Sequence, residues 1–235
     1  MSVTGNRIKV SHMMLRYTLP LLLSTGCQPS QCDIVASLPD DGTLLTLGDS
    51  ILAWSSPRCE SVSDYIGVAL STRAHVAAEN GAWMLDGDPA IPLQHIPGPW
   101  STVIINGGAN DLNDQCGCGE CDDILDQLST PDGAYGAMPF LVDDITASGA
   151  AVALLGYYQM PDSAWYGFDA CGAAITALNE RYETIARQRE LVTFVPLEDV
   201  MRFDERPEDF AFDNVHPSAE GAERIASAVA AAIAP

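Results

Sequence analysis

Leu44-Leu45-Thr46-Leu47-Gly48-Asp49-Ser50 is the stretch that best indicates the fold, because it is a short apolar strand that ends at a glycine and turns sharply to present a serine. A strand ending in a tight turn at the carboxyl edge of a sheet can hold one side chain rigidly above that edge. Gly-Asp-Ser is also an ordinary turn sequence. Ser50 is therefore a functional candidate only if the rest of the chain supplies it with partners.

Strands and helices alternate along the rest of the chain. Apolar or β-branched runs predict further strands at 75–78, 102–105, 151–155 and 191–195. Helical patterns lie at 50–54, 61–73, 138–148, 173–189 and 217–233, the last with Pro217 in its first turn. Residues 87–99, rich in Pro and Gly, predict a loop. This alternation predicts an α/β fold, a parallel sheet covered by helices on both faces.

Composition limits the class of protein and its partners. The chain has 235 residues, of which 47% are hydrophobic and 18% charged, and this balance is typical of a globular domain with a substantial core. Its formal net charge is -21. So acidic a surface repels phosphate backbones and anionic lipid headgroups, which argues against nucleic-acid binding.

The N-terminus has the anatomy of an export signal. Arg16 precedes an apolar run at 17–23, which is too short for a membrane span of about 20 residues. The following Ser24-Thr25-Gly26-Cys27 resembles the lipobox of bacterial lipoproteins, although Leu23 lies one place early. A secretory signal with Cys27 in a disulfide is the alternative. We predict an export segment at 1–27, a linker at 28–41 and a folded domain at 42–235, in the periplasm or cell envelope, with membrane contact only through a lipid at Cys27.

Six cysteines remain if Cys27 carries lipid, and an even set suits disulfides outside the cytoplasm. They are Cys32, Cys59, Cys116, Cys118, Cys121 and Cys171. The sequence does not choose among their possible pairings. The three cysteines at 116–121 could join a zinc site, but a closed structural site needs four ligands and no nearby fourth is evident. Disulfides are the favoured interpretation.

Ser50 needs a base, because a free hydroxyl is a poor nucleophile at neutral pH. Among the four histidines, His216 stands apart because Asp213 precedes it by three positions and Pro217 follows it. One turn could then deliver both the imidazole and the carboxylate that orients its other nitrogen. The alternative is a helix-start turn with an exposed histidine.

A serine nucleophile also needs hydrogen-bond donors for the oxyanion of its tetrahedral intermediate. Asn110 comes shortly after the predicted strand at 102–105, so its amide could reach over the same sheet edge. Gly81 could bring its backbone N–H close with no side chain in the way. Both positions also fit ordinary turns.

Taken together, these blocks resemble the GDSL/SGNH hydrolase family in residue type, order and secondary-structure context. They are Gly48-Asp49-Ser50, Gly81, Gly108-Ala109-Asn110-Asp111 and Asp213-Asn214-Val215-His216-Pro217. The resemblance implies a flavodoxin-like α/β/α sandwich with five parallel strands. It implies Ser50 as nucleophile, His216 as base and Asp213 as its orienting acid. The implied oxyanion hole comprises the Ser50 and Gly81 N–H groups with the Asn110 side chain, and no metal or organic cofactor is needed.

One segment departs from the family pattern: the acidic, cysteine-rich insertion at about 111–133, beside Asn110. If cross-linked, this insertion could wall the substrate cleft. Trp54, four residues after Ser50, either lines an acyl pocket or packs in the core. Tyr157, Tyr158 and Trp165 follow the strand at 151–155 and are candidates for the border of the site.

These observations predict a serine esterase that hydrolyses a lipid, aryl or O-acetyl glycan ester through an acyl-enzyme on Ser50. Two alternatives remain. An acyltransferase would pass the same acyl group to a sugar or lipid hydroxyl. A non-catalytic surface lipoprotein would bind acylated glycans or lipids on an inactive hydrolase scaffold.

Overall fold

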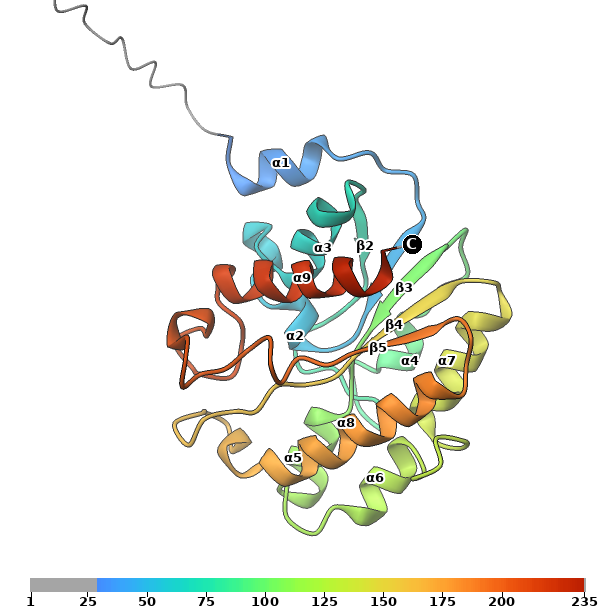
Figure 1. Cartoon of the computed structure of the whole chain (residues 1–235), viewed down its shortest axis with the longest axis vertical. Coiled ribbons are helices and arrows are strands. Elements are labelled where there is room, and N and C mark those ends of the chain that lie inside the picture. The colour runs from blue at the N-terminus through green and yellow to red at the C-terminus, as the bar shows by residue number, and fades with distance from the viewer. Residues whose placement is uncertain (1–28, 235) are drawn as a thin grey trace, which may run out of the picture.

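Five parallel strands form the central sheet in the order β2-β1-β3-β4-β5 (Figure 1). The computed structural model describes residues 29–234. The predicted export segment and its Cys27 lie outside these residues. The strands are β1 (Leu44–Leu47), β2 (Ala74–Val76), β3 (Thr102–Ile105), β4 (Ala151–Leu155) and β5 (Val192–Val195). The predicted α/β sandwich with a five-stranded parallel sheet is confirmed.

Helices cover both faces of this sheet. In Figure 1, α3 and α9 lie on one face, while α7 and α8 lie on the other with α5 and α6 beyond them. The helices are α1 (Gln31–Ser37), α2 (Ser50–Ala53), α3 (Val62–Leu70), α4 (Ile91–Gln94), α5 (Ala109–Cys116), α6 (Asp122–Leu128), α7 (Ala137–Ala147), α8 (Gly172–Arg187) and α9 (Ala219–Ile233). The short 3-10 helices are η1 (Ser56–Arg58), η2 (Phe168–Ala170) and η3 (Pro207–Asp209).

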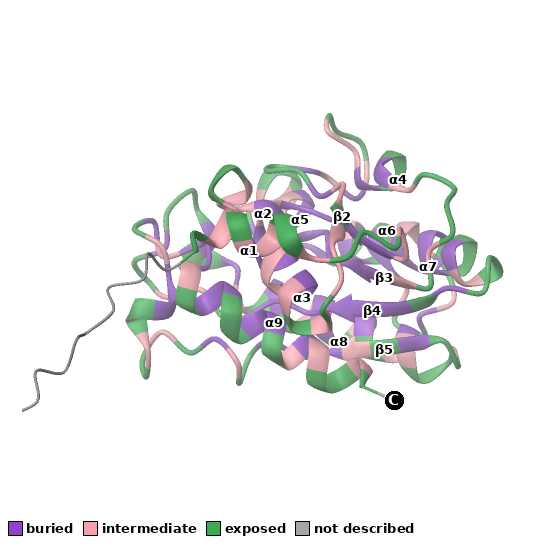
Figure 2. Ribbon diagram, turned by 90° about the horizontal axis from the view of Figure 1, so that it is seen from above, coloured by how far each residue is buried: buried purple, intermediate pink, exposed green. Residues whose placement is uncertain are grey.

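The core lies between the sheet and these helices, and the central strands are buried on both sides (Figure 2). All four residues of β1 are buried, as are the last three of β3 and the last four of β4. A strand buried on both faces is a continuous apolar run without alternation. This is why β1, β3 and β4 have the bounds predicted from the sequence.

Two local predictions were wrong. The predicted loop at 87–99 contains the short helix α4, whose residue Gln94 is buried and bonds both Gly48 N and Gly48 O through its side chain. Pro217 is not in the last helix, which begins at Ala219. Ser218 is its N-cap, and the Ser218 hydroxyl accepts from the Gly221 N–H at 3.2 Å. A serine cap satisfies an orphan N–H at the helix start, so the helix begins after the proline.

The described cysteines form three disulfides, which confirms that disulfide bonds are present. The pairs are Cys32–Cys59, Cys116–Cys121 and Cys118–Cys171. The first ties α1, which lies within the predicted linker at 28–41, to the residue that follows η1. Cys116–Cys121 lies within the acidic insertion, which folds as most of α5 and as α6. Cys118–Cys171 joins the insertion to the residue just before α8.

None of the helices in residues 29–234 has the length and apolar character needed to cross a membrane.

Candidate active site

Ser50 is the first residue of α2, at the carboxyl end of β1. The helix begins there because the Asp49 side chain accepts from the Ile51 N–H at 2.9 Å as an N-cap. The turn before it requires a glycine: Gly48 has a φ of 148°, and a Cβ at this position would collide with the side chain and carbonyl of Asn106. The backbone at 48–50 is thus held against the end of β3.

His216 lies between Ser50 and Asp213. Its Nε2 is 2.8 Å from Ser50 Oγ, and its Nδ1 is 2.6 Å from Asp213 Oδ2. An ionised carboxylate can only accept, so Nδ1 carries the proton and Nε2 is left to accept from the serine hydroxyl. The three predicted residues therefore meet in the order that a nucleophile, base and orienting acid require.

The loop holding Asp213 and His216 is fixed by its own carboxylate. Asp213 is fully buried, and its Oδ1 accepts from the N–H groups of Val215 and His216, both at 3.1 Å. Desolvation acts to raise the pKa of Asp213, but the hydrogen bonds from the His216 ring and these two N–H groups outweigh it. The pKa of this carboxyl is therefore lower than usual, and Asp213 is ionised at neutral pH.

Gly81 and Asn110 lie on segments that the structure joins. Asn110 Nδ2 donates to the carbonyl of Ala82 at 2.9 Å, which uses one of its two amide hydrogens. Gly81 has a φ of 74°, and a Cβ there would meet no atom within 4 Å. The glycine is thus favoured by its backbone conformation, and its Cα faces open space where a substrate could approach.

Asp111 holds the loop that follows Gly81, a role that was not predicted from the sequence. Its carboxylate accepts from the N–H groups of Met84 at 2.9 Å and Leu85 at 2.8 Å. Desolvation raises the pKa of Asp111 despite these bonds. Together with the Asn110 bond, these contacts fasten the loop after β2 to the start of α5, so two predicted oxyanion donors are held by one connection.

Asp49 forms a buried network beneath Ser50 that the sequence did not reveal. Its carboxylate accepts from Asn106 Nδ2 at 2.7 Å and from the Tyr157 hydroxyl at 2.6 Å, besides the Ile51 N–H. Desolvation raises the pKa of Asp49, while these donors favour its ionised form. The network links the ends of β1, β3 and β4, and thereby fixes the turn that presents Ser50.

Comparison with known proteins identifies the family. The sequence profile of the GDSL-like lipase/acylhydrolase family matches residues 46–224. The chain belongs to this family. It is an esterase or acylhydrolase, and the family prediction made from the sequence is confirmed. No similar sequence was found among curated proteins.

Solved structures share the fold of this acylhydrolase at low identity. A carbohydrate esterase family 2 enzyme with a carbohydrate-binding domain, from Myceliophthora fergusii, has a TM-score of 0.57 at 18% identity, covering 83% of this chain and 66% of that one. The lipase Lip_vut3 from a goat rumen metagenome has a TM-score of 0.53 at 17% identity, with coverages of 81% and 97%. TesA has a TM-score of 0.56 at 23% identity, with coverages of 82% and 98%. At these identities the likeness shows a shared fold.

Aromatic side chains lie beside His216 in this acylhydrolase. Trp54 stacks on the His216 ring, and Phe212, which is 71% exposed, lies 6.3 Å from Trp54 between ring centroids. Trp165 is half-exposed and touches Phe212, so it borders this surface. Tyr158 does not border it, because its ring is buried and its hydroxyl donates to Val215 O at 2.7 Å.

A cavity of about 400 Å³ lies against this aromatic surface. Its lining combines apolar side chains, two of them aromatic, with polar ones: Trp54, Ser55, Arg58, Glu60, Asn80, Ala211, Phe212, Pro217, Ser218 and Ala219. Asn80, Phe212 and Pro217 each adjoin a predicted site residue in the sequence. Trp54 also stacks on His216, so the cavity is next to the predicted site residues and its lining could contact part of a substrate held at Ser50.

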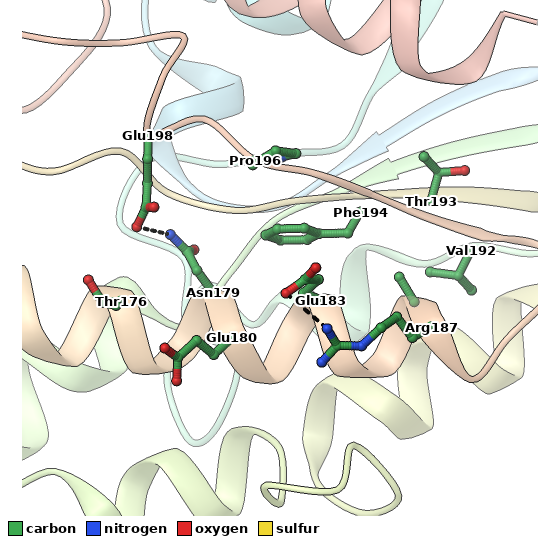
Figure 3. A pocket seen from close by; sticks show the side chains of 11 residues that line it. Thr176, Asn179, Glu180, Glu183, Arg187, Val192, Thr193, Phe194, Pro196 and Glu198 are labelled. Carbon is green, nitrogen blue, oxygen red and sulfur yellow. Dashed lines mark hydrogen bonds and ion pairs between the residues drawn. The ribbon is translucent and has the colours of Figure 1, made fainter.

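A larger cavity, of about 580 Å³, lies elsewhere, between α8 and the edge strand β5. Figure 3 shows its lining side chains, among which Glu198 meets Asn179 at 3.1 Å and Glu183 meets Arg187 at 3.2 Å. None of the predicted site residues lines it. The volume of a cavity therefore does not by itself identify the active site of this enzyme.

Within residues 29–234, no three His, Cys, Asp or Glu side chains are grouped so that they could hold a metal ion.

Proposed function

We propose that this acylhydrolase cleaves carboxylic esters through an acyl-enzyme on Ser50. The observation that carries the proposal is the chain of two hydrogen bonds from Ser50 through His216 to Asp213, at 2.8 and 2.6 Å. Ser50 Oγ would attack the ester carbonyl carbon while its proton passes to His216 Nε2. Collapse of the tetrahedral intermediate would break the bond to the alcohol oxygen, which takes that proton as it leaves.

Water would then release the acid. His216 accepts a proton from the attacking water, the Ser50 ester bond breaks, and the proton returns to Ser50 Oγ. In both steps the oxyanion would receive hydrogen bonds from the backbone N–H groups of Ser50 and Gly81 and from the second amide hydrogen of Asn110. Such donors are typically worth about 3 kcal/mol each in the barrier, because they are already oriented when charge develops.

The substrate class that we propose is a lipid, aryl or O-acetyl glycan ester. The cavity beside Trp54 supports this range, since its aromatic rings offer apolar contact and its polar rim offers hydrogen bonds. The proteins of similar fold include a lipase and a carbohydrate esterase, which is compatible with a lipid ester or an O-acetyl glycan as substrate. We further propose that the protein is exported and anchored by a lipid at Cys27, a location in which its three disulfides would persist.

The test is turnover of p-nitrophenyl acetate and butyrate by Ser50→Ala and His216→Ala. Both variants should lose activity by roughly 10⁴-fold or more, because the members of a triad act as a unit. Ser227→Ala and His75→Ala, which alter exposed residues on α9 and β2, are matched controls and should keep wild-type rates. Folded Ser50→Ala protein with wild-type turnover would rule out the mechanism.

Two further measurements separate the alternatives. A fluorophosphonate probe should label Ser50 in the wild type and not in Ser50→Ala; absence of labelling in the wild type would favour the non-catalytic binding protein. Product analysis with an added alcohol or glycan acceptor should show free acid as the main product. Acylated acceptor in excess of free acid would instead indicate an acyltransferase.

A further inference from the structure

Trp54 and His216 form a parallel stack at the centre of the proposed active site. Their ring centroids are 3.9 Å apart and their planes differ by 4°. Trp54 directly follows α2, and its backbone N–H donates to the backbone carbonyl of Ser50 at 2.8 Å. The helix turn that begins with the nucleophile therefore also places an indole on the face of the base.

This geometry distinguishes between the two charge states of the imidazole. Neutral aromatic rings have negative faces and positive edges, so they favour offset or edge-to-face packing over a close parallel sandwich. A cation over the face of a tryptophan is instead attracted by the ring, and tryptophan is the strongest partner of this kind. The stack is thus better suited to the imidazolium than to the neutral imidazole.

We propose that Trp54 is a positioning residue that selectively stabilises the protonated ring of His216, and so favours proton transfer from Ser50. The inference rests on the proposed role of His216 as base. Protonation of that ring accompanies attack by Ser50, so an interaction stronger in the charged state lowers the barrier and leaves ground-state binding unchanged. The same contact holds the imidazole plane in line with Ser50 Oγ.

Other charges near His216 cannot supply the same effect on its face. Asp213 meets the ring at Nδ1, in its plane, and is already ionised. Asp49 is buried and engaged by three donors, and acts on the ring only at longer range. Arg58 and Glu60, in the cavity that Trp54 lines, pair with each other at 2.9 Å. Trp54 is the group whose π-face covers the imidazole.

The test compares Trp54→Leu, which keeps an apolar side chain without a π-face, with Trp54→Phe, which keeps a weaker one. We expect the midpoint of the acid limb of kcat/KM to move to lower pH by about 0.4 to 1.5 pH units in Trp54→Leu and by less in Trp54→Phe. The sign follows because removing an interaction with the cation makes protonation harder. Folding of each variant is checked by its melting temperature.

A second readout does not depend on ester turnover. The chain has four histidines, so ¹³C-labelled histidine spectra can follow His216 directly through a pH titration, with His216→Ala identifying its signal. The same downward shift should appear in Trp54→Leu. Trp100→Leu is the matched control, since Trp100 lies against His75 at 5.4 Å with rings tilted by 39°. It should leave the His216 midpoint unchanged.

An unchanged His216 midpoint in folded Trp54→Leu, with only a raised KM, would overturn the proposal and make Trp54 a substrate contact. An equal shift in Trp100→Leu would also overturn it. These outcomes differ from failure of the proposed function, which would appear as activity retained by Ser50→Ala while the titration arm remains interpretable. If Trp54→Leu does not fold, Trp54→Phe decides: a downward shift supports the proposal and none contradicts it.

Discussion

Tyr157 donates its hydroxyl to Asp49 Oδ2 at 2.6 Å, across 108 positions of the sequence. Tyr157 follows β4 and Asp49 follows β1, so the bond spans the strand between them at the carboxyl edge of the sheet. Burial, together with the neighbouring Asp49 charge, raises the pKa of Tyr157 well above its usual value. The hydroxyl therefore stays protonated and donates to the carboxylate of the turn that presents Ser50.

Tyr157→Phe should destabilise the fold and slow turnover, because it removes a donor to a buried carboxylate. We expect a loss of about 1.5–3 kcal/mol in the free energy of unfolding, measured with urea. Tyr158→Phe is the matched comparison: it removes a bond to the neutral carbonyl of Val215 and should cost about 1 kcal/mol. Equal stability of Tyr157→Phe and the wild type would show that the Asp49 network contributes nothing to stability.

The lowered pKa of Asp213 predicts how the free energy of unfolding changes in acid. Its pKa is lowered in the folded state, so its contribution is fully present above the unfolded pKa of about 3.9 and is lost as the pH falls through the lower folded pKa. The difference in unfolding free energy between wild type and Asp213→Asn should therefore be constant from pH 7 to about pH 5 and shrink below about pH 4. A difference that instead grew as the pH fell would contradict the lowered pKa.

The two disulfides that involve cysteines of the insertion should differ in their effect on stability. Cys118–Cys171 spans 53 positions and Cys116–Cys121 spans 5. In the chain-entropy model the longer loop is worth about 4 kcal/mol and the shorter about 2 kcal/mol, because a longer loop restricts the unfolded chain more. Double alanine variants of each pair, compared by chemical unfolding, check this order. The reverse order would mean that chain entropy does not govern the contribution of these bonds.

Phe212 should affect substrate preference more than stability. The ring is 71% exposed, so Phe212→Ala should change the unfolding free energy by no more than about 0.5 kcal/mol. If the ring contacts larger substrates, kcat/KM for p-nitrophenyl butyrate should fall about fivefold relative to the acetate, as expected for about 1 kcal/mol of apolar contact. Phe140→Ala, at a similarly exposed phenylalanine on α7, is the control. An equal loss with both esters would show that Phe212 does not contact the acyl chain.

Much of the fold was predictable because local patterns of apolar residues indicate its strands. The strands β1, β3 and β4 are continuous apolar runs since both their faces are buried, and their bounds needed no knowledge of their neighbours. The contact between Asp213 and His216 was predictable for a similar reason: one turn of the chain carries both groups. The helix α4 was missed because Gln94 stabilises it through Gly48, far away in the sequence.

The segment at 44–50 shows which features could be predicted from local sequence and which required the tertiary structure. The residues from Leu44 to Ser50 by themselves indicated a strand, a glycine turn and a serine at the edge of a sheet, since an apolar run and the residue types of a turn are local features of the sequence. Only the tertiary structure decided the cysteine pairing, the Tyr157 bond to Asp49 and the stacking of Trp54 on His216. Apart from the Cys116–Cys121 pair, each of these contacts joins groups at least 27 positions apart, and such contacts depend on how the chain packs after its local structure has formed.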